Sequence, residues 1–202
     1  MKRMAGTAFL MAAALSVGAC AAQYTGPVEV TRFVGADTAA RLGSGPVFIE
    51  AAPGASSPLA LSPYTAAVAQ QLEQLGYNES ARTGARQIAE VRLERYQISG
   101  AGNRSPVSVG VGGSTGTYGS GAGLGLGINL GGGQRDRIGT QLAVTIRDAA
   151  TGQSLWEGRA DFQASDNSPL ASGPANAQTV AAALFEGFPG NNGETIEVEV
   201  SE

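Results

Sequence analysis

Polar and apolar residues alternate along three segments of the chain, which is the pattern of a β-strand with one buried and one solvated face. The segments are residues 88–96, 138–147 and 155–162. In the third, Trp156 and Phe162 share the apolar side with two small residues. The other positions predicted to face inward are Ala89, Val91, Leu93, Leu142, Val144, Ile146, Gly158 and Ala160.

Shorter patterns predict the remaining elements. Residues 28–34 and 46–50 are predicted strands bounded by turn-forming residues. A helix is predicted to begin at Ser62-Pro63, because serine is a good N-cap and proline suits the first helical position. Its apolar residues recur at helical spacing up to the stop at Gly76: Tyr64, Val68, Leu72 and Leu75. A second helix covers residues 179–185, and the tail 196–200 is either an edge strand or a loose acidic end.

This order of elements predicts the α+β fold class: a two-layer antiparallel sheet with two helices packed on one face and a glycine-rich hairpin. Residues 28–190 form a single domain, within which residues 100–133 are the glycine-rich insert. Residues 191–202 form the acidic C-terminal edge strand or tail. A length of 202 residues suits one domain with a proper core.

The N-terminus has the layout of an export signal: Met1-Lys2-Arg3, a short apolar run, then small residues. The run is shorter than the roughly 20 residues that span a bilayer. Val17-Gly18-Ala19-Cys20 resembles a bacterial lipobox, which implies a signal peptide over 1–19, a lipid-modified Cys20 and a tether over 20–27. The alternative is an ordinary signal peptide cut near Ala22. Ala21, where an aspartate would retain such a protein in the inner membrane, favours the outer membrane.

The amino-acid composition limits the kinds of catalytic and metal-binding site that this chain can form. Histidine is absent, and Lys2, the only lysine, lies within the predicted signal peptide. The mature chain therefore cannot form a Ser-His-Asp catalytic triad, a lysine Schiff base or a histidine-based metal site. Two carboxylate pairs remain as candidates for acid–base catalysis, Glu90 with Glu94 and Glu157 with Asp161. Each pair has an arginine between its two members, which is the pattern of the solvated face of a strand. We expect no enzymatic activity, cofactor or metal. The acidic balance, 17 acidic against 13 basic residues, argues against nucleic-acid binding.

Residues 100–133 hold 14 of the 30 glycines, from Gly100 to Gly133. Two alternating runs, 107–112 and 124–130, predict a hairpin with a bare glycine face, joined by a long loop over 114–120. The glycines at 119, 123, 127 and 131 also fit a membrane glycine zipper, although the period of two favours strands. The bare face would allow an envelope partner or a second copy to approach closely.

The chain resembles an uncharacterised family of Gram-negative envelope lipoproteins, domain of unknown function 4136. The resemblance lies in the Cys20 lipobox, "QQLEQLGY" at 70–77, "GTQLAVTIRDAATGQSLWEGRA" at 139–160 and "FEGFPG" at 185–190. It implies an outer-membrane lipoprotein with a small α/β domain and assigns no activity. We therefore expect a structural or interaction role in the envelope. The alternative is a carrier with an apolar-lined cavity of roughly 300 Å³ or more between sheet and helices.

Overall fold

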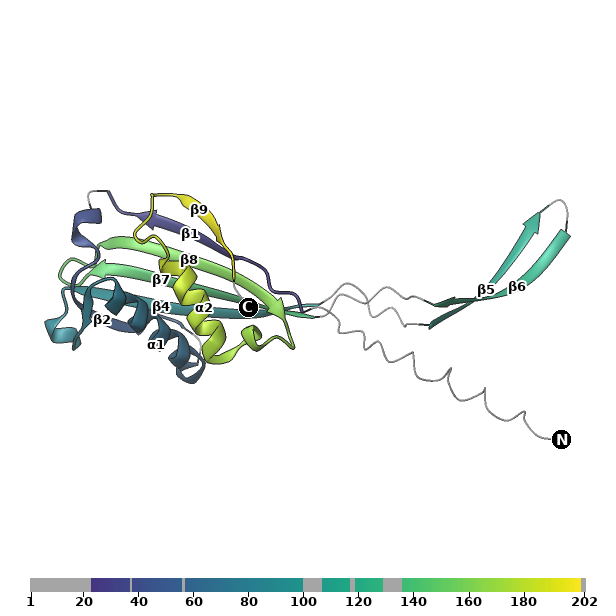
Figure 1. Ribbon diagram of the computed structural model, residues 1–202, viewed down its shortest axis with the longest axis horizontal. Coiled ribbons are helices and arrows are strands. Elements are labelled where there is room, and N and C mark those ends of the chain that lie inside the picture. Colours follow the sequence, from purple (N-terminus) through teal and green to yellow (C-terminus); the bar gives the residue numbers. More distant parts are fainter. Residues whose placement is uncertain are drawn as a thin grey trace, which may run out of the picture.

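The computed structural model describes residues 23–36, 38–55, 57–99, 107–116, 119–128 and 136–200. The α+β class is confirmed, with a mostly antiparallel seven-stranded sheet in the order β3-β2-β4-β7-β8-β1-β9 and two helices (Figure 1). The strands are β1 (Val28–Val34), β2 (Gly45–Ala51), β3 (Tyr77–Glu79), β4 (Gln87–Ile98), β5 (Val107–Gly116), β6 (Gly119–Ile128), β7 (Arg137–Asp148), β8 (Ser154–Ser165) and β9 (Glu194–Val198). The helices are α1 (Pro58–Gln74) and α2 (Gly173–Phe185), with short 3-10 turns η1 (Ala39–Arg41), η2 (Arg82–Gly84) and η3 (Pro169–Ala171).

The three strictly alternating segments form the centre of the sheet as β4, β7 and β8. Each extends beyond its predicted bounds to twelve residues, and the three pair antiparallel in sequence. Every residue predicted to face inward on β4 and β7 is buried, and Trp156, Ala160 and Phe162 of β8 are fully buried. Alternation along these strands therefore predicted their orientation correctly.

The prediction of a wholly antiparallel sheet is wrong at one edge. Strand β2 runs parallel to both of its neighbours, β3 and β4. The physical reason is its connection: α1 carries the chain back to the starting end of β2, so the next strand runs in the same direction. Strand β3, only three residues long, was not predicted.

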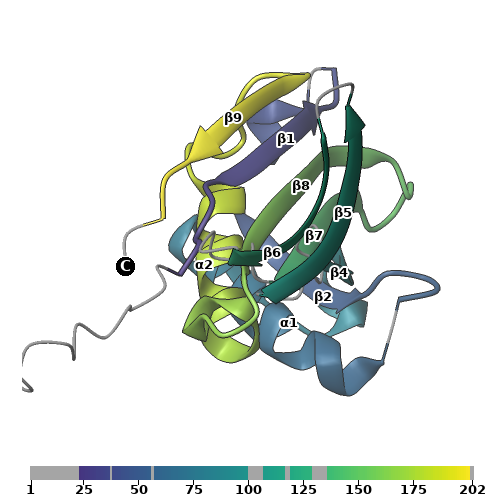
Figure 2. The ribbon, with the colours of Figure 1, turned by 90° about the vertical axis from the view of Figure 1, so that its right-hand side faces the viewer.

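Both helices pack against one face of the sheet and against each other (Figures 1 and 2). Helix α1 begins at Pro58, not at Ser62-Pro63 as predicted. Pro63 lies inside the helix, where its missing N–H leaves only the carbonyl of the highly exposed Leu59 without a helical partner, and water can replace that bond. Helix α2 begins at Gly173, six residues before its predicted start, because Pro174 occupies its first turn instead of a loop.

Of the two structures predicted for the C-terminal residues, an edge strand or a loose tail, the edge strand is present. Strand β9 pairs antiparallel with β1, so the pair β1–β9 closes one side of the sheet. Strands β5 and β6 form a separate two-stranded antiparallel sheet in which residues 114–116 pair with 119–121. The predicted long loop over 114–120 is therefore wrong, because pairing continues until only residues 117 and 118 lie between the strands.

Candidate functional site

No described helix or strand covers the face of the sheet opposite the helices, and this face carries both carboxylate pairs singled out in the sequence. The pairing of β4, β7, β8, β1 and β9 aligns side chains into rows that run across the strands. One row is Glu94, Gln141, Asp161, Glu29 and Glu197; the next is Arg92, Ala143, Arg159, Thr31 and Thr195; the third is Glu90, Thr145, Glu157 and Phe33. We call this surface the open face.

The rows alternate in charge, acidic, basic and acidic, at a spacing of two strand residues, about 6.6 Å. Within the first row Asp161, Glu29 and Glu197 stand directly opposite one another on three neighbouring strands. Like charges in that arrangement are destabilising. The register of the strands therefore places these carboxylates side by side, although they do not form ion pairs with one another.

Four of the eight charged side chains in these rows have a polar partner among the described residues; two of them are Glu157, which accepts a hydrogen bond from Ser154 Oγ, and Arg92, which donates to the Pro53 carbonyl, both at 3.1 Å. Glu90 pairs with Arg147 at 3.0 Å, and Asp161 accepts a hydrogen bond from Gln141 Nε2 at 2.8 Å. Among the described residues Arg159 forms no ion pair within 4 Å. The open face therefore presents unpaired charges of both signs to solvent.

Neither carboxylate pair singled out in the sequence consists of directly neighbouring residues on the open face. Glu90 and Glu94 are four residues apart on one strand, as are Glu157 and Asp161, which places their Cα atoms about 13 Å apart. Paired glycosidase carboxyl groups lie about 5–9.5 Å apart.

A shallow groove of about 470 Å³ runs over the open face, and an aromatic side chain borders it. Phe33 at the end of β1 is 53% exposed, although it is a large apolar residue. It stands opposite Glu157 in the third row. An exposed aromatic group between charged rows is the kind of feature that anchors protein interfaces.

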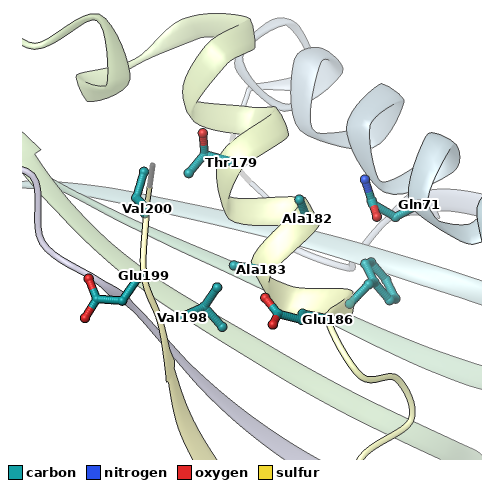
Figure 3. Close-up of a pocket in the computed structure, with 9 residues that line it drawn as sticks. Gln71, Thr179, Ala182, Ala183, Glu186, Val198, Glu199 and Val200 are labelled. Carbon is teal, nitrogen blue, oxygen red and sulfur yellow. The ribbon is translucent and has the colours of Figure 1, made fainter. Parts of the chain in front are cut away.

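Two other grooves lie on the helix side. The first, about 380 Å³, separates α2 from the C-terminal residues 198–200 (Figure 3). In that view Val198 and Val200 lie on one side, and Ala183 of α2 and Glu186, which follows the helix, lie on the other. The second, about 540 Å³, lies between α1 and strands β2 and β3. Both exceed the volume that a carrier needs, but carboxylates stand among the side chains that line them, Glu186 and Glu199 in one and Glu73 and Glu79 in the other.

The most unusual buried group is Arg32, which the sequence analysis did not single out. Its side chain is 1% exposed and lies beneath the C-terminus of α2. Its Nη2 donates to the carbonyl oxygens of Leu184, at 3.3 Å, and of Glu186, and Nη1 pairs with Glu194 at 3.1 Å. Nε has no partner within the described structure. The sequence could have indicated that Arg32 is buried, because residue 32 lies on the same face of its strand as the buried Val28 and Val30.

Arg32 performs a structural task. The last carbonyl groups of a helix lack partners and carry partial negative charge, which a cation satisfies. The pKa of Glu194 lies below its ordinary value, chiefly because Asn191 donates hydrogen bonds to it, with Arg32 adding to the effect. The pair therefore ties β1 and β9 to α2.

A second buried polar cluster joins both helices to the sheet. The Tyr64 hydroxyl donates to Asn176 Oδ1 at 2.6 Å, and Asn176 Nδ2 donates to the carbonyl of Leu170 at 2.7 Å and to Thr140 Oγ1 at 3.3 Å. Burial raises the pKa of Tyr64. Because each of these groups has a hydrogen-bond partner, the cluster holds the two helices against each other and against the sheet.

Cys20, the predicted lipid-attachment residue, lies outside the described residues, as does the signal segment. The first described residue is Gln23, whose side chain donates to the carbonyl of Asn167. Within the described ranges no helix is long and apolar enough to cross a membrane. The described part of the chain also contains no group of three or more acidic, histidine or cysteine residues placed to hold a metal ion.

The model of the family called domain of unknown function (DUF4136) matches residues 44–190. No curated protein matches. A PDZ domain protein from Parabacteroides distasonis superposes with a TM-score of 0.54 and 11% identity, over 87% of this chain and 38% of that protein. A PelC dodecamer from Paraburkholderia phytofirmans gives a TM-score of 0.44 and 14% identity over 78% of this chain and 94% of that one. At 11% identity the likeness to the PDZ domain protein concerns the fold alone.

Proposed function

The chain belongs to the family of domain of unknown function 4136, and from that premise we propose that it is a lipid-anchored lipoprotein on the periplasmic side of the outer membrane. Cys20 carries the acyl chains, and the domain that follows acts as a non-catalytic interaction protein of the cell envelope. The proposal is supported by the lipobox and by a lone cysteine with no partner for a disulfide.

The anchor is tested by changing Cys20→Ser. The variant should leave the membrane fraction or accumulate with its signal attached, because it has no thiol to acylate. Membrane fractionation and mass spectrometry of the N-terminal peptide measure both outcomes. Normal processing and membrane association of the variant would contradict the anchor.

The interaction role is carried by one observation, the open face with its alternating rows of charge and its exposed Phe33. A face that only solubilised the sheet would not need an exposed phenylalanine beside unpaired charges of both signs. The complementary partner is a protein surface with alternating charges and an apolar pocket. Steering by such charges speeds association and selects the partner.

A photoreactive phenylalanine analogue at Phe33 tests this role in intact cells. The matched control places the same analogue at Leu59, which is 84% exposed on the helix side. We expect a discrete crosslinked product from position 33 only, weakened by Arg159→Glu. Its mass distinguishes an envelope protein from a second copy of this chain. Equal crosslinking at the two positions, or none at position 33, would refute the role of the open face.

A glycine-rich hairpin over residues 100–133 is a second candidate for contact, favoured by the register of β5 and β6. That register places Gly110 opposite Gly125 and Gly112 opposite Gly123, which leaves two alternate cross-strand pairs without a Cβ atom. We propose that a second chain can approach this surface. Gly125→Val should then abolish concentration-dependent association in sedimentation experiments while the fold is kept. A parent protein that is monomeric throughout would remove this candidate.

A further inference from the structure

The tether to the proposed lipid anchor is fixed to one end of the sheet. The Tyr24 N–H donates to Ser165 Oγ, and the Ser165 N–H donates back to the Tyr24 carbonyl, both at 2.8 Å. The Gly26 N–H donates to the carbonyl of Gln163 at 3.0 Å. These bonds hold residues 24–26 along the end of β8, so the point from which the chain runs back to Cys20 lies at this end of the sheet.

Little chain separates this fixed point from Cys20. Three residue steps lie between Cys20 and Gln23, and an extended chain covers at most about 11 Å in three steps. The headgroup region of one leaflet is about 5–8 Å thick. An acylated Cys20 at the inner boundary of the headgroups therefore holds Gln23 within or beside them.

The end of the sheet reached in this way carries two exposed tyrosines, Tyr24 at 41% and Tyr96 at 42% exposure. The guanidinium group of Arg137 lies 4.0 Å from the centre of the Tyr24 ring. Tyr96 stands opposite Gly139, and its ring occupies the space that a Cβ atom would need there. Tyrosine rings of this kind concentrate where lipid headgroups meet water, because one end is apolar and the other forms hydrogen bonds.

Among the described residues at this end of the sheet the formal charges cancel. Arg95 and Arg137 lie near the ends of β4 and β7, and Asp136 and Asp166 lie beside them, with the Asp166 N–H bonded to the Asp136 carbonyl.

We propose that this end of the sheet, marked by Tyr24, Tyr96 and Arg137, rests on the phospholipid surface and that the strands stand away from it. The inference rests on the proposed lipid anchor and adds an orientation to it. Strand β7 has twelve residues and is roughly 40 Å long, so the turn at Asp148–Gln153 lies well away from the bilayer. Ile98 and Arg137 pair at the membrane end, so the segment between them leaves and re-enters the domain there.

The test uses the full lipidated protein, in which acylation of Cys20 leaves no free thiol. Single cysteines are introduced by Gln97→Cys near the membrane end and by Ala150→Cys in the far turn, both at exposed positions. Each is labelled with the same fluorophore, and the protein is bound to vesicles of phosphatidylethanolamine and phosphatidylglycerol that contain a nitroxide-headgroup lipid. We expect quenching at position 97 to exceed that at position 150 severalfold.

Two results separate this inference from the proposed anchor. Equal quenching at both positions of a lipidated, vesicle-bound protein would overturn the orientation and leave the anchor intact. A protein without lipid on Cys20 by mass spectrometry would overturn both. Tyr24→Ser combined with Tyr96→Ser should reduce the quenching at position 97 severalfold while membrane fractionation persists. Unchanged quenching in that variant would remove the tyrosines from the contact.

Discussion

Arg32 offers the most demanding test of the packing described above, because a single side chain joins β1, β9 and the end of α2. Arg32→Met keeps an unbranched apolar stem in the site but removes the guanidinium group. The carbonyls of Leu184 and Glu186 then lose their charged donor, and Glu194 loses its cation. We expect the helix end and the β9 edge to loosen together.

The size of the effect follows from the bonds that are lost. Each hydrogen bond to a charged group contributes about 1.5–3 kcal/mol, and a buried acceptor left without a partner costs about 1–3 kcal/mol. Arg32 forms bonds to at least two such carbonyl groups and is 1% exposed. Because methionine regains some apolar burial and the unpartnered Nε is removed, we expect a net loss of about 3–4 kcal/mol in the free energy of unfolding.

Urea unfolding of residues 21–202, followed by circular dichroism, measures this loss for the parent, Arg32→Met and Arg32→Lys. Lysine keeps the charge with fewer donors and should recover only part of the stability. Arg82→Met is the matched control, since Arg82 is an exposed arginine paired with Glu50 and should change stability by about 1 kcal/mol or less. If Arg32→Met unfolds at the same urea concentration as the control, the guanidinium group does not hold the end of α2 as argued.

Three further predictions follow from buried or shifted groups. Trp156→Ala should lower the free energy of unfolding by about 3–5 kcal/mol, because the ring is fully buried; an unchanged thermal midpoint would contradict its place in the core. Tyr64→Phe should cost about 1–3 kcal/mol by leaving Asn176 Oδ1 unpartnered, and a double-mutant cycle with Asn176→Ala should give a non-zero coupling energy. Hydrogen bonds from Thr151 hold the pKa of Asp148 below its ordinary value. Asp148 therefore stabilises the fold above its unfolded-state pKa of about 3.9, and this contribution disappears as pH falls through the lower folded value. Asp148→Asn should be less stable than the parent near neutral pH, and the difference should vanish in acid; a difference independent of pH would exclude the carboxylate.

Local pattern alone determined the central strands and their orientation. Side chains on a strand alternate between its faces, so a run such as 155–162 states which residues are buried wherever the strand is placed. Trp156 and Leu142 could be assigned to the core on that basis, and they are buried. The helix starts were less well predicted, because Pro58, Pro63 and Pro174 all resemble start signals and only tertiary packing selects among them.

Strand pairing, by contrast, depends on residues far apart in the chain and could not be derived from any local period. The parallel edge at β2, the rows of charge on the open face and the burial of Arg32 all arise from which strands become neighbours and in what register. The same holds for the tether, which bonds to residues about 140 positions away at the end of β8. The sequence by itself determined which face of each central strand is polar. Only the tertiary structure aligned those polar faces into one surface, because register is set by packing across the whole sheet.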